Sequence, residues 1–191
     1  TLVLTTTLRA MREIAGALRQ HFSADGSMEV LLQGEAPKRE LTDRFTQGQH
    51  GGNAGCILVA SASFWEGVDV PGESLQLVVI DKLPFSPPDD PLVQARSRQL
   101  EAKGKNPFQH LHVPQAAIAL KQGAGRLIRR ITDRGILVVC DIRLTQMGYG
   151  RRILAALPAM RVVKTEGQFI QALDELTKPS TRDQPTLDHQ P

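Results

Sequence analysis

The chain has 191 residues, of which 41% are hydrophobic and 23% charged, so it is long enough to bury one sizeable core. Its 23 Lys and Arg residues barely outnumber its 20 Asp and Glu residues, so the total charge does not argue for a nucleic-acid partner. The apolar runs are too short to span a bilayer, and two isolated cysteines without a paired histidine cannot build a metal site. We therefore expect a cytoplasmic protein with no membrane partner and no bound metal of its own.

Short β-rich runs alternate with helical patterns along the chain, which is typical of parallel strands joined by crossover helices. In chain order, strands are expected at residues 2–5, 29–32, 56–60, 75–80 and 135–140, with a late strand at 161–164. Most of these runs are continuously apolar, as strands covered on both faces should be. The sequence thus predicts an α/β fold with a parallel sheet flanked by helices on both faces.

Helices are expected between these strands. Apolar residues recur at helical spacing in two N-terminal segments, at Leu8, Met11, Ala15 and Leu18 and again at Leu41 and Phe45. Asp90 before Pro91 predicts the capped start of a longer helix, and Pro114 opens another that we expect to run to about Arg130. Residues 177–191 contain three prolines and no apolar stripe, so a disordered tail is expected there after a folded domain at 1–176.

The clearest chemical signal is the segment QGAGRLIRR at residues 122–130. At about 100° per residue, we expect Gln122, Gly125, Arg126 and Arg129 to share one helical face. Glycine costs about 1 kcal/mol relative to alanine inside a helix, so two glycines on the polar side indicate that something approaches the backbone closely. Arginine forks beside small residues suit the oxygens of a triphosphate. A merely solvated basic face would not explain the glycines.

A second signal begins where the third predicted strand ends, in the segment ASASFWEGVDVPG at residues 60–72. Ligands of open α/β sheets bind outside the carboxyl ends of the strands, so this segment is expected to lie at the ligand-binding position. Gly67 permits backbone conformations closed to other residues, Asp69 supplies a carboxylate, and Ser61 and Ser63 supply hydroxyl groups.

Aromatic and basic residues near these strand ends have two possible roles. Trp65 is at least as well explained as a core residue as by base stacking. The next predicted strand leads into the proline-rich segment IDKLPFSPPDDP at residues 80–91. A stiff loop can direct Lys82 and Phe85 toward nucleic acid, but a proline-braced turn before a capped helix explains them equally well.

Two motifs of a complete ATPase are missing from the sequence. It contains no Gly-x4-Gly-Lys-Ser/Thr segment, the pattern of a phosphate-cradling P-loop. No acidic pair follows an apolar strand, as a site for Mg²⁺ and the attacking water would require. We therefore expect this chain by itself to hydrolyse no ATP.

The motifs resemble a known family, the superfamily 2 DNA helicases of the DinG and YoaA type, relatives of the helicase XPD. Residues 122–129 resemble helicase motif VI, and residues 63–72 resemble motif V in its DinG-like form. Four further segments of this chain resemble stretches of the same family: residues 1–18 (its motif IV), Leu83-Pro84-Phe85, Asp141-x-Arg143 and Tyr149-Gly150. The likeness covers roughly residues 1–176.

The resemblance implies that the chain is helicase domain 2, the C-terminal RecA-like lobe of an ATP-dependent helicase that moves 5′ to 3′ along single-stranded DNA. ATP and Mg²⁺ would lie between this lobe and an N-terminal lobe, which would carry the P-loop, the DEAH-type box and an iron–sulfur cluster. By the resemblance, Arg129 is the arginine finger and Arg126 acts beside it. Nucleotide contacts then fall to Gln122, Gly125, Glu66, Gly67 and Asp69, and DNA contacts to Ser61, Ser63, Trp65, Lys82 and Phe85.

Two other functions stay open. YoaA-type helicases are thought to dock a clamp-loader subunit of the replication machinery, so the chain can instead be a partner-docking module that uses helix faces near residues 149–157 or 169–176. The lobe could also come from a chromatin or RNA helicase, although the FWEGVD form of motif V and the proline-rich stretch argue against that origin.

Overall fold

The computed structural model describes residues 1–22, 27–48, 55–61, 64, 74–125, 127 and 133–177. In chain order the elements are β1 (Leu2–Thr5), α1 (Leu8–Phe22), β2 (Met28–Leu32), α2 (Lys38–Gln47), β3 (Gly55–Ser61), β4 (Leu77–Ile80), α3 (Pro91–Ala102), η3 (Phe108–His112), α4 (Val113–Ala124), β5 (Ile136–Val139), α5 (Arg143–Gln146), α6 (Gly150–Ala155) and α7 (Glu166–Thr177). The chain divides into two compact units, the first spanning Thr1–Met160 and the second beginning at Arg161.

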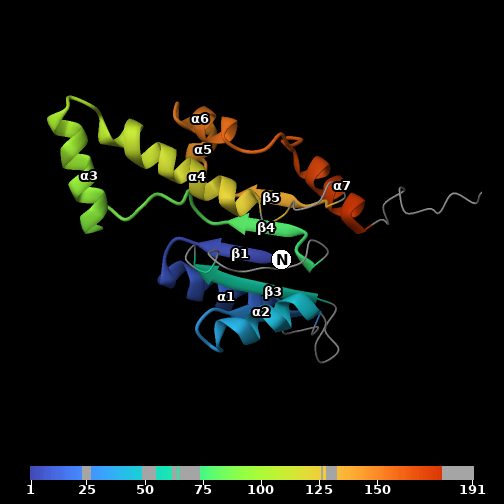
Figure 1. Cartoon of the computed structure of the whole chain (residues 1–191). Coiled ribbons are helices and arrows are strands. Elements are labelled where there is room, and N and C mark those ends of the chain that lie inside the picture. The colour runs from blue at the N-terminus through green and yellow to red at the C-terminus, as the bar shows by residue number, and fades with distance from the viewer. Residues whose placement is uncertain are drawn as a thin grey trace, which may run out of the picture. The chain divides into compact units, whose positions relative to one another are not determined.

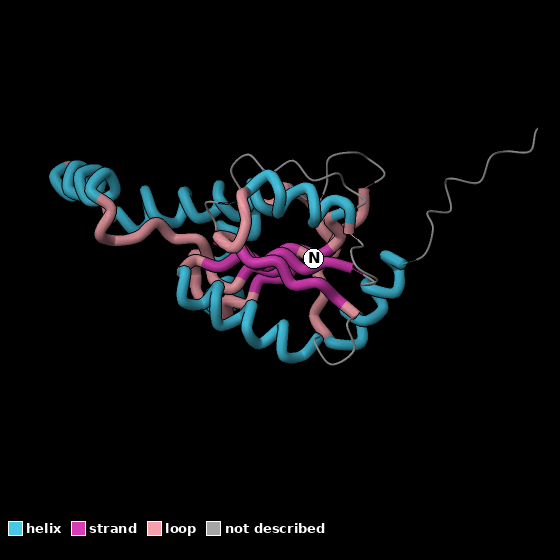
Figure 2. The backbone as a smooth tube through the Cα atoms, turned by 90° about the horizontal axis from the view of Figure 1, so that it is seen from below, coloured by secondary structure: helices cyan, strands magenta, loops and turns pink. Residues whose placement is uncertain are grey.

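The five strands form one parallel sheet in the order β2-β3-β1-β4-β5 (Figure 1). The first strand lies in the middle, with Val3 opposite both Val59 of β3 and Val79 of β4. The chain moves outward from β1 to β2 and then back to β3, so right-handed crossovers place α1 and α2 on opposite faces. Figure 2 shows the sheet edge-on with helices on both faces, and the predicted α/β class is confirmed.

Alternate side chains of the strands supply two apolar cores. On one face, Leu4 and Leu58 pack with Phe45 of α2 and Leu120 of α4, all of them buried. On the other face the core consists of buried Val3, Met11, Ala15, Val30, Ile57 and Val59. Full burial of one large apolar side chain is worth about 1.5–3 kcal/mol. The two cores therefore fix the sheet and, with it, the edges at which the strands begin and end.

Five of the six predicted strands are present, with ends that move by no more than two residues. The sixth, at residues 161–164, is wrong because these residues form no strand. Two adjacent valines favour β structure locally, but Val162 is 71% exposed and has no neighbouring strand to cover it. The backbone N–H of Lys164 instead donates to the side-chain oxygen of Gln168 at 2.9 Å, at the start of α7.

The start of α3 agrees with its predicted cap. The Asp90 carboxylate accepts hydrogen bonds from the backbone N–H groups of Leu92 at 2.8 Å and Val93 at 3.0 Å, and Pro91 is the first helical residue. These bonds satisfy two of the N–H groups that every helix leaves free at its start.

The end of α4 differs from the prediction. The helix ends at Ala124 instead of near Arg130. Leu127 lies in a turn, and its backbone N–H donates to the Ala124 carbonyl at 3.1 Å. Gly123 is buried on the apolar side, because it follows buried Leu120 by three residues. Two glycines within three positions weaken the helix here. The single polar face expected for residues 122–129 therefore does not continue along one unbroken α-helix.

The second unit contains α7 and the segment before it. Arg161 pairs with Glu175 at 2.9 Å across this unit, and Ala172 is buried. Residues 178–191, where the tail is expected, lie outside the described part of the chain. Among the helices described, none has the length and apolar character needed to cross a membrane.

Candidate functional site

The carboxyl ends of the five parallel strands gather polar side chains at one edge of the sheet, which we call the carboxyl edge. The strand arrows of Figure 1 point toward this edge. The polar residues that end the strands or follow them within two positions include, in sheet order, Gln33, Ser61, Thr5, Lys82 and Asp141. Ligands of open α/β sheets bind in this position. The structure thus brings Ser61 and Lys82 to the same edge, with one strand, β1, between theirs.

Ser61 is held by Gln33, a residue that the sequence did not single out. The Gln33 side-chain oxygen accepts from the backbone N–H of Ser61 at 2.7 Å and from its hydroxyl at 2.9 Å. Gln33 itself follows β2, and its N–H donates to the carbonyl of Val59 at 3.0 Å. Gly34 then turns the chain with φ at 98°, a conformation that favours glycine. The signal in the sequence that could have identified Gln33 was a polar residue directly before a glycine at the end of a predicted strand.

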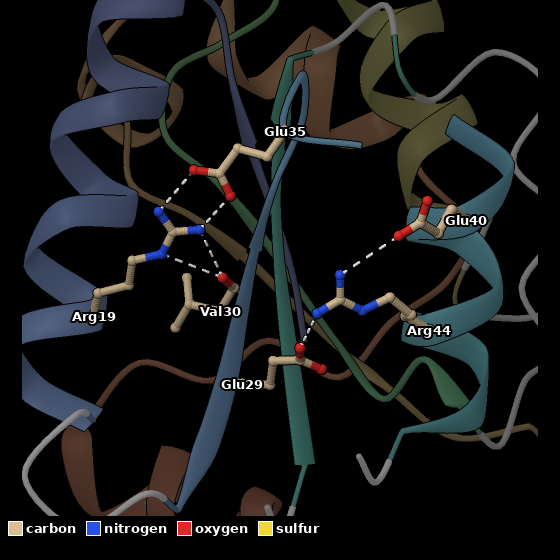
Figure 3. A network of polar contacts seen from close by, with 6 residues as sticks. All are labelled: Arg19, Glu29, Val30, Glu35, Glu40 and Arg44. Carbon is tan, nitrogen blue, oxygen red and sulfur yellow. Dashed lines mark hydrogen bonds and ion pairs between the residues drawn. The ribbon is translucent and has the colours of Figure 1, made fainter. Parts of the chain in front are cut away.

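The turn that carries Gln33 is fixed from α1. Arg19 donates to the Val30 carbonyl at 3.0 Å and to the Glu35 carboxylate at 2.8 Å (Figure 3). β2 is an edge strand of the described sheet, so this guanidinium also satisfies a carbonyl that has no strand beside it. On the other side of β2, Arg44 of α2 pairs with Glu29 (Figure 3). β2 is therefore held from both faces of the sheet, by Arg44 near its amino end and by Arg19 from its middle to the turn that follows it.

Asp141 clamps the loop that carries Lys82 and Phe85. Its buried carboxylate accepts from the Leu83 N–H at 2.9 Å and from the Arg143 N–H at 3.0 Å. The Arg143 guanidinium also contacts the same carboxylate, with its Nη2 at 2.6 Å. The Arg143 hydrogen bonds, with the backbone donors, outweigh burial and lower the pKa of Asp141 from 3.8 to about 2. Asp141 is therefore ionised at neutral pH and joins the end of β5 to the loop after β4.

Phe85 belongs to an aromatic cluster next to this clamp. Its half-buried ring lies 5.7 Å from the ring of Phe108 and 5.9 Å from that of Tyr149, centre to centre. The Arg143 guanidinium lies over the Phe85 ring at 5.5 Å. Lys82 is exposed and directly precedes Leu83, which is buried and clamped by Asp141. The structure thus places Phe85 mainly in packing contacts and leaves Lys82 in solvent.

Gln122 and Gly125 lie at the opposite edge of the sheet, where β4 and β5 begin, which we call the amino edge. The turn after α4 reaches this edge, because a Cβ at Gly135 would lie 2.8 Å from the Leu127 side chain and 3.1 Å from the Gln76 carbonyl. Gln122 and Gly125 are both exposed. Strands of four to seven residues rise about 3.3 Å per residue, so the two edges are roughly 13–23 Å apart.

The remaining predicted site residues lie outside the described part of the chain. They are Arg126 and Arg129 of the motif VI segment, and Ser63, Trp65, Glu66, Gly67 and Asp69 of the motif V segment. Among the residues described, no group of three or more His, Cys, Asp or Glu side chains is placed to hold a metal ion.

Charge is unevenly distributed between two parts of the first unit. Residues 1–90 contain 7 Lys and Arg against 12 Asp and Glu, whereas residues 91–160 contain 12 against 3. The second part supplies α3, η3, α4, β5, α5 and α6. The near-neutral total charge hides this polarity, which favours a polyanion on the part built from α3 to α6.

Comparison with known proteins shows what this chain resembles. The family described as Helicase C-terminal domain matches residues 1–160. The ATP-dependent DNA helicases YoaA of Haemophilus influenzae and Escherichia coli are 43% and 49% identical to it over 90% and 82% of this chain, respectively. The ATP-dependent helicase DinG of Mycobacterium tuberculosis is 40% identical over 93% of this chain.

These matches cover only part of each relative. The aligned region is 25%, 23% and 26% of those three proteins, so the chain spans about a quarter of their length. A solved XPD helicase superposes with a TM-score of 0.54 over 84% of this chain and 28% of its own, at 19% identity, which shows a shared RecA-like fold. The chain belongs to the helicase C-terminal domain family and is of the DinG and YoaA type.

Proposed function

We propose that this chain is one motor lobe of an ATP-dependent DNA helicase that binds single-stranded DNA at its carboxyl edge and nucleotide at its amino edge. The observation that carries the proposal is the separation of two pairs of partly or fully exposed residues at opposite edges of one sheet. Ser61 and Lys82 lie at the first edge, and Gln122 and Gly125 lie at the second. A lobe with this arrangement can hold both ligands at once without competition between them.

The amino edge is suited to a triphosphate only if cations join it. The carboxyl end of α4 is the negative end of its helix dipole, which repels phosphate. The sequence places Arg126, Arg129 and Arg130 directly after that end. Arginine forks can bind phosphate oxygens bidentately and offset the dipole. We therefore assign ATP contacts to Gln122, Gly125, Arg126 and Arg129, with Glu66, Gly67 and Asp69 from the motif V segment.

The partner lobe completes the engine in this proposal. When bound, ATP with Mg²⁺ supplies the phosphoryl group that is transferred to water. The N-terminal lobe would contribute the P-loop, the DEAH-type box and the iron–sulfur cluster, and this chain would contribute Arg129 as the arginine finger and Arg126 beside it. The motor would act in the cytoplasm and move 5′ to 3′. At the carboxyl edge, Ser61, Ser63, Lys82, Trp65 and Phe85 would contact the strand.

Arg129→Ala in the whole helicase tests the nucleotide part of this proposal. We expect loss of ATP hydrolysis with nucleotide affinity and DNA affinity within about threefold, because an arginine finger acts mainly in the transition state and is worth about 10³–10⁵ in rate. Arg129→Lys should fail nearly as badly, since a point charge cannot reproduce the fork. Lys121→Ala, which removes an exposed cation of α4, is the matched control and should keep its turnover.

Steady-state ATPase with saturating single-stranded DNA gives the rates, and a melting curve excludes unfolding. Normal turnover in a folded Arg129→Ala protein would remove the arginine finger from the proposal. Duplexes with a 5′ or a 3′ tail test direction in the same preparation, and only the 5′-tailed duplex should be unwound.

A second candidate function is docking of a protein partner such as a clamp-loader subunit of the replication machinery. Large apolar side chains are exposed in the second unit, with Val162 at 71% and Ile170 at 51%. Such side chains often mark protein interfaces. Titration of the chain with the purified subunit in a calorimeter tests this candidate, and Ile170→Asp should abolish the heat of binding without altering DNA affinity.

A further inference from the structure

Phe108 is an aromatic residue that packs against other rings and is still partly exposed to solvent. It begins η3, a π-helix, and 41% of its surface is exposed. The ring centres of Tyr149, Phe85 and His112 lie at 5.1 Å, 5.7 Å and 6.3 Å from its own. These neighbours hold the ring in place and leave part of the residue exposed. Short π-helical segments occur frequently at functional sites.

Three cationic residues lie close to Phe108 in the sequence or contact the residue next to it. Lys103 and Lys105 precede it, and Arg152 of α6 reaches the backbone carbonyl of the adjacent Gln109 at 3.5 Å. All three side chains are exposed. Within the described part of the chain, none of them pairs with a carboxylate. They belong to the part of the unit in which basic residues outnumber acidic ones by 12 to 3.

Proteins that bind single-stranded nucleic acid combine an aromatic ring for the base with cations for the neighbouring phosphates. A base in a duplex is already stacked on both faces and cannot use such a ring. We propose that Phe108 is a base-stacking platform for single-stranded DNA, with Lys105 and Arg152 beside the flanking phosphates. This inference rests on the proposed function, because it extends the DNA path at the carboxyl edge from Lys82 through the Phe85 contact to η3.

Anisotropy of a labelled oligothymidine measures the contribution of the ring in the 191-residue chain. Phe108→Ala should weaken binding by about fivefold or more, because the stacking of one base on an aromatic ring contributes a binding free energy that corresponds to at least about this factor. Phe108→Leu keeps an apolar side chain but removes the π-face and should lose nearly as much, while Phe108→Tyr should stay within about twofold of the wild type. Phe169→Leu, in α7, makes the same replacement elsewhere and should leave affinity unchanged.

A cross-link locates the contact directly in the wild-type protein. An oligonucleotide with 5-iodouracil joins to an aromatic ring stacked on it when irradiated, and trypsin should release the adduct on the peptide of residues 106–121, whose one aromatic ring of the Phe, Tyr or Trp type is Phe108. Lys105→Ala and Arg152→Ala should each lower the slope of log Kd against log salt by about 0.7 for a single strand.

The outcomes separate this inference from the proposed function. If the wild-type chain binds single strands but the Phe108 variants bind equally well and the adduct lies on another peptide, the platform is wrong and the DNA lobe stands. If the wild-type chain binds no single strand at low salt, both are wrong. Base stacking would also be refuted if a duplex bound the wild-type chain as tightly as the single strand and bound the Phe108→Ala variant more weakly.

Discussion

Replacement of Asp141 by asparagine should cost about 2 kcal/mol of stability at pH 7. The change keeps the size of the side chain but removes the charge that Leu83 and Arg143 contact. Lowering the carboxyl pKa from 3.8 to about 2 corresponds to about 2 kcal/mol, since each pH unit is worth about 1.4 kcal/mol. The side chain of Asp141 is only 6% exposed, so solvent does little to screen this interaction.

The direction of the pH dependence follows from the sign of the pKa change. Because folding lowers the pKa of Asp141, its contribution is complete above the unfolded pKa near 3.8 and is lost as the pH falls toward 2. The stability difference between wild type and Asp141→Asn should therefore stay constant from pH 8 to about 5 and fall to about half by pH 3.

Urea unfolding of both proteins at pH 7, 5 and 3, followed by circular dichroism, gives this difference. Asp43→Asn is the matched control, because Asp43 is 61% exposed and its pair with Arg39 is 3.9 Å long, so that change should cost less than about 0.5 kcal/mol. A difference for Asp141→Asn below about 0.5 kcal/mol at pH 7, or one that does not change with pH, would show that the clamp contributes little through its charge.

Three further outcomes are expected. Gly150→Ala should destabilise the chain by about 3 kcal/mol or more in thermal unfolding, because its Cβ would lie 2.0 Å from the Leu144 carbonyl oxygen. The control Gly148→Ala places a Cβ that meets nothing within 4 Å and should be nearly neutral, so equal melting temperatures of the two variants would contradict this prediction. Arg44→Ala should lower the free energy of unfolding measured in urea by about 1–3 kcal/mol, because it leaves the Glu29 carboxylate, which is 18% exposed, without its Arg44 partner. Arg39→Ala removes a side chain that is 95% exposed and should have little effect, so similar losses in both variants would refute this prediction. Single-stranded DNA should bind the chain weakly and with strong salt dependence, because phosphates supply much of the contact; an affinity unchanged between about 50 and 200 mM salt would contradict it.

The sequence predicted those parts of the fold that depend on local pattern. Continuous apolar runs located the strands, and Asp90 before Pro91 located the start of α3, because the cap involves neighbours in the chain. The pattern failed where neighbours in space decide. Val162 and Val163 have β-branched side chains but no strand to pair with, and the end of α4 depends on how Gly123 packs.

The candidate site was predictable in its residue types and less so in its arrangement. Helical spacing placed Gln122 and Gly125 together, and strand ends placed Ser61 and Lys82 together, but the sequence did not assign the two pairs to opposite edges. That assignment follows from the direction of α4, which runs against the strands. Gln33 and the Asp141 clamp were not predicted as positioning groups, since their partners Ser61 and Leu83 are 28 and 58 residues away.

The central place of β1 affects how the chain folds during synthesis. Its residue Leu2 lies opposite Leu58 of β3 and Val78 of β4, so after β1 leaves the ribosome it must wait for both of its neighbours. Contacts between such distant residues fold slowly and leave apolar segments unprotected meanwhile. The nascent apolar strand therefore needs shielding, by a chaperone or by earlier parts of a longer chain, until residues 77–80 have emerged.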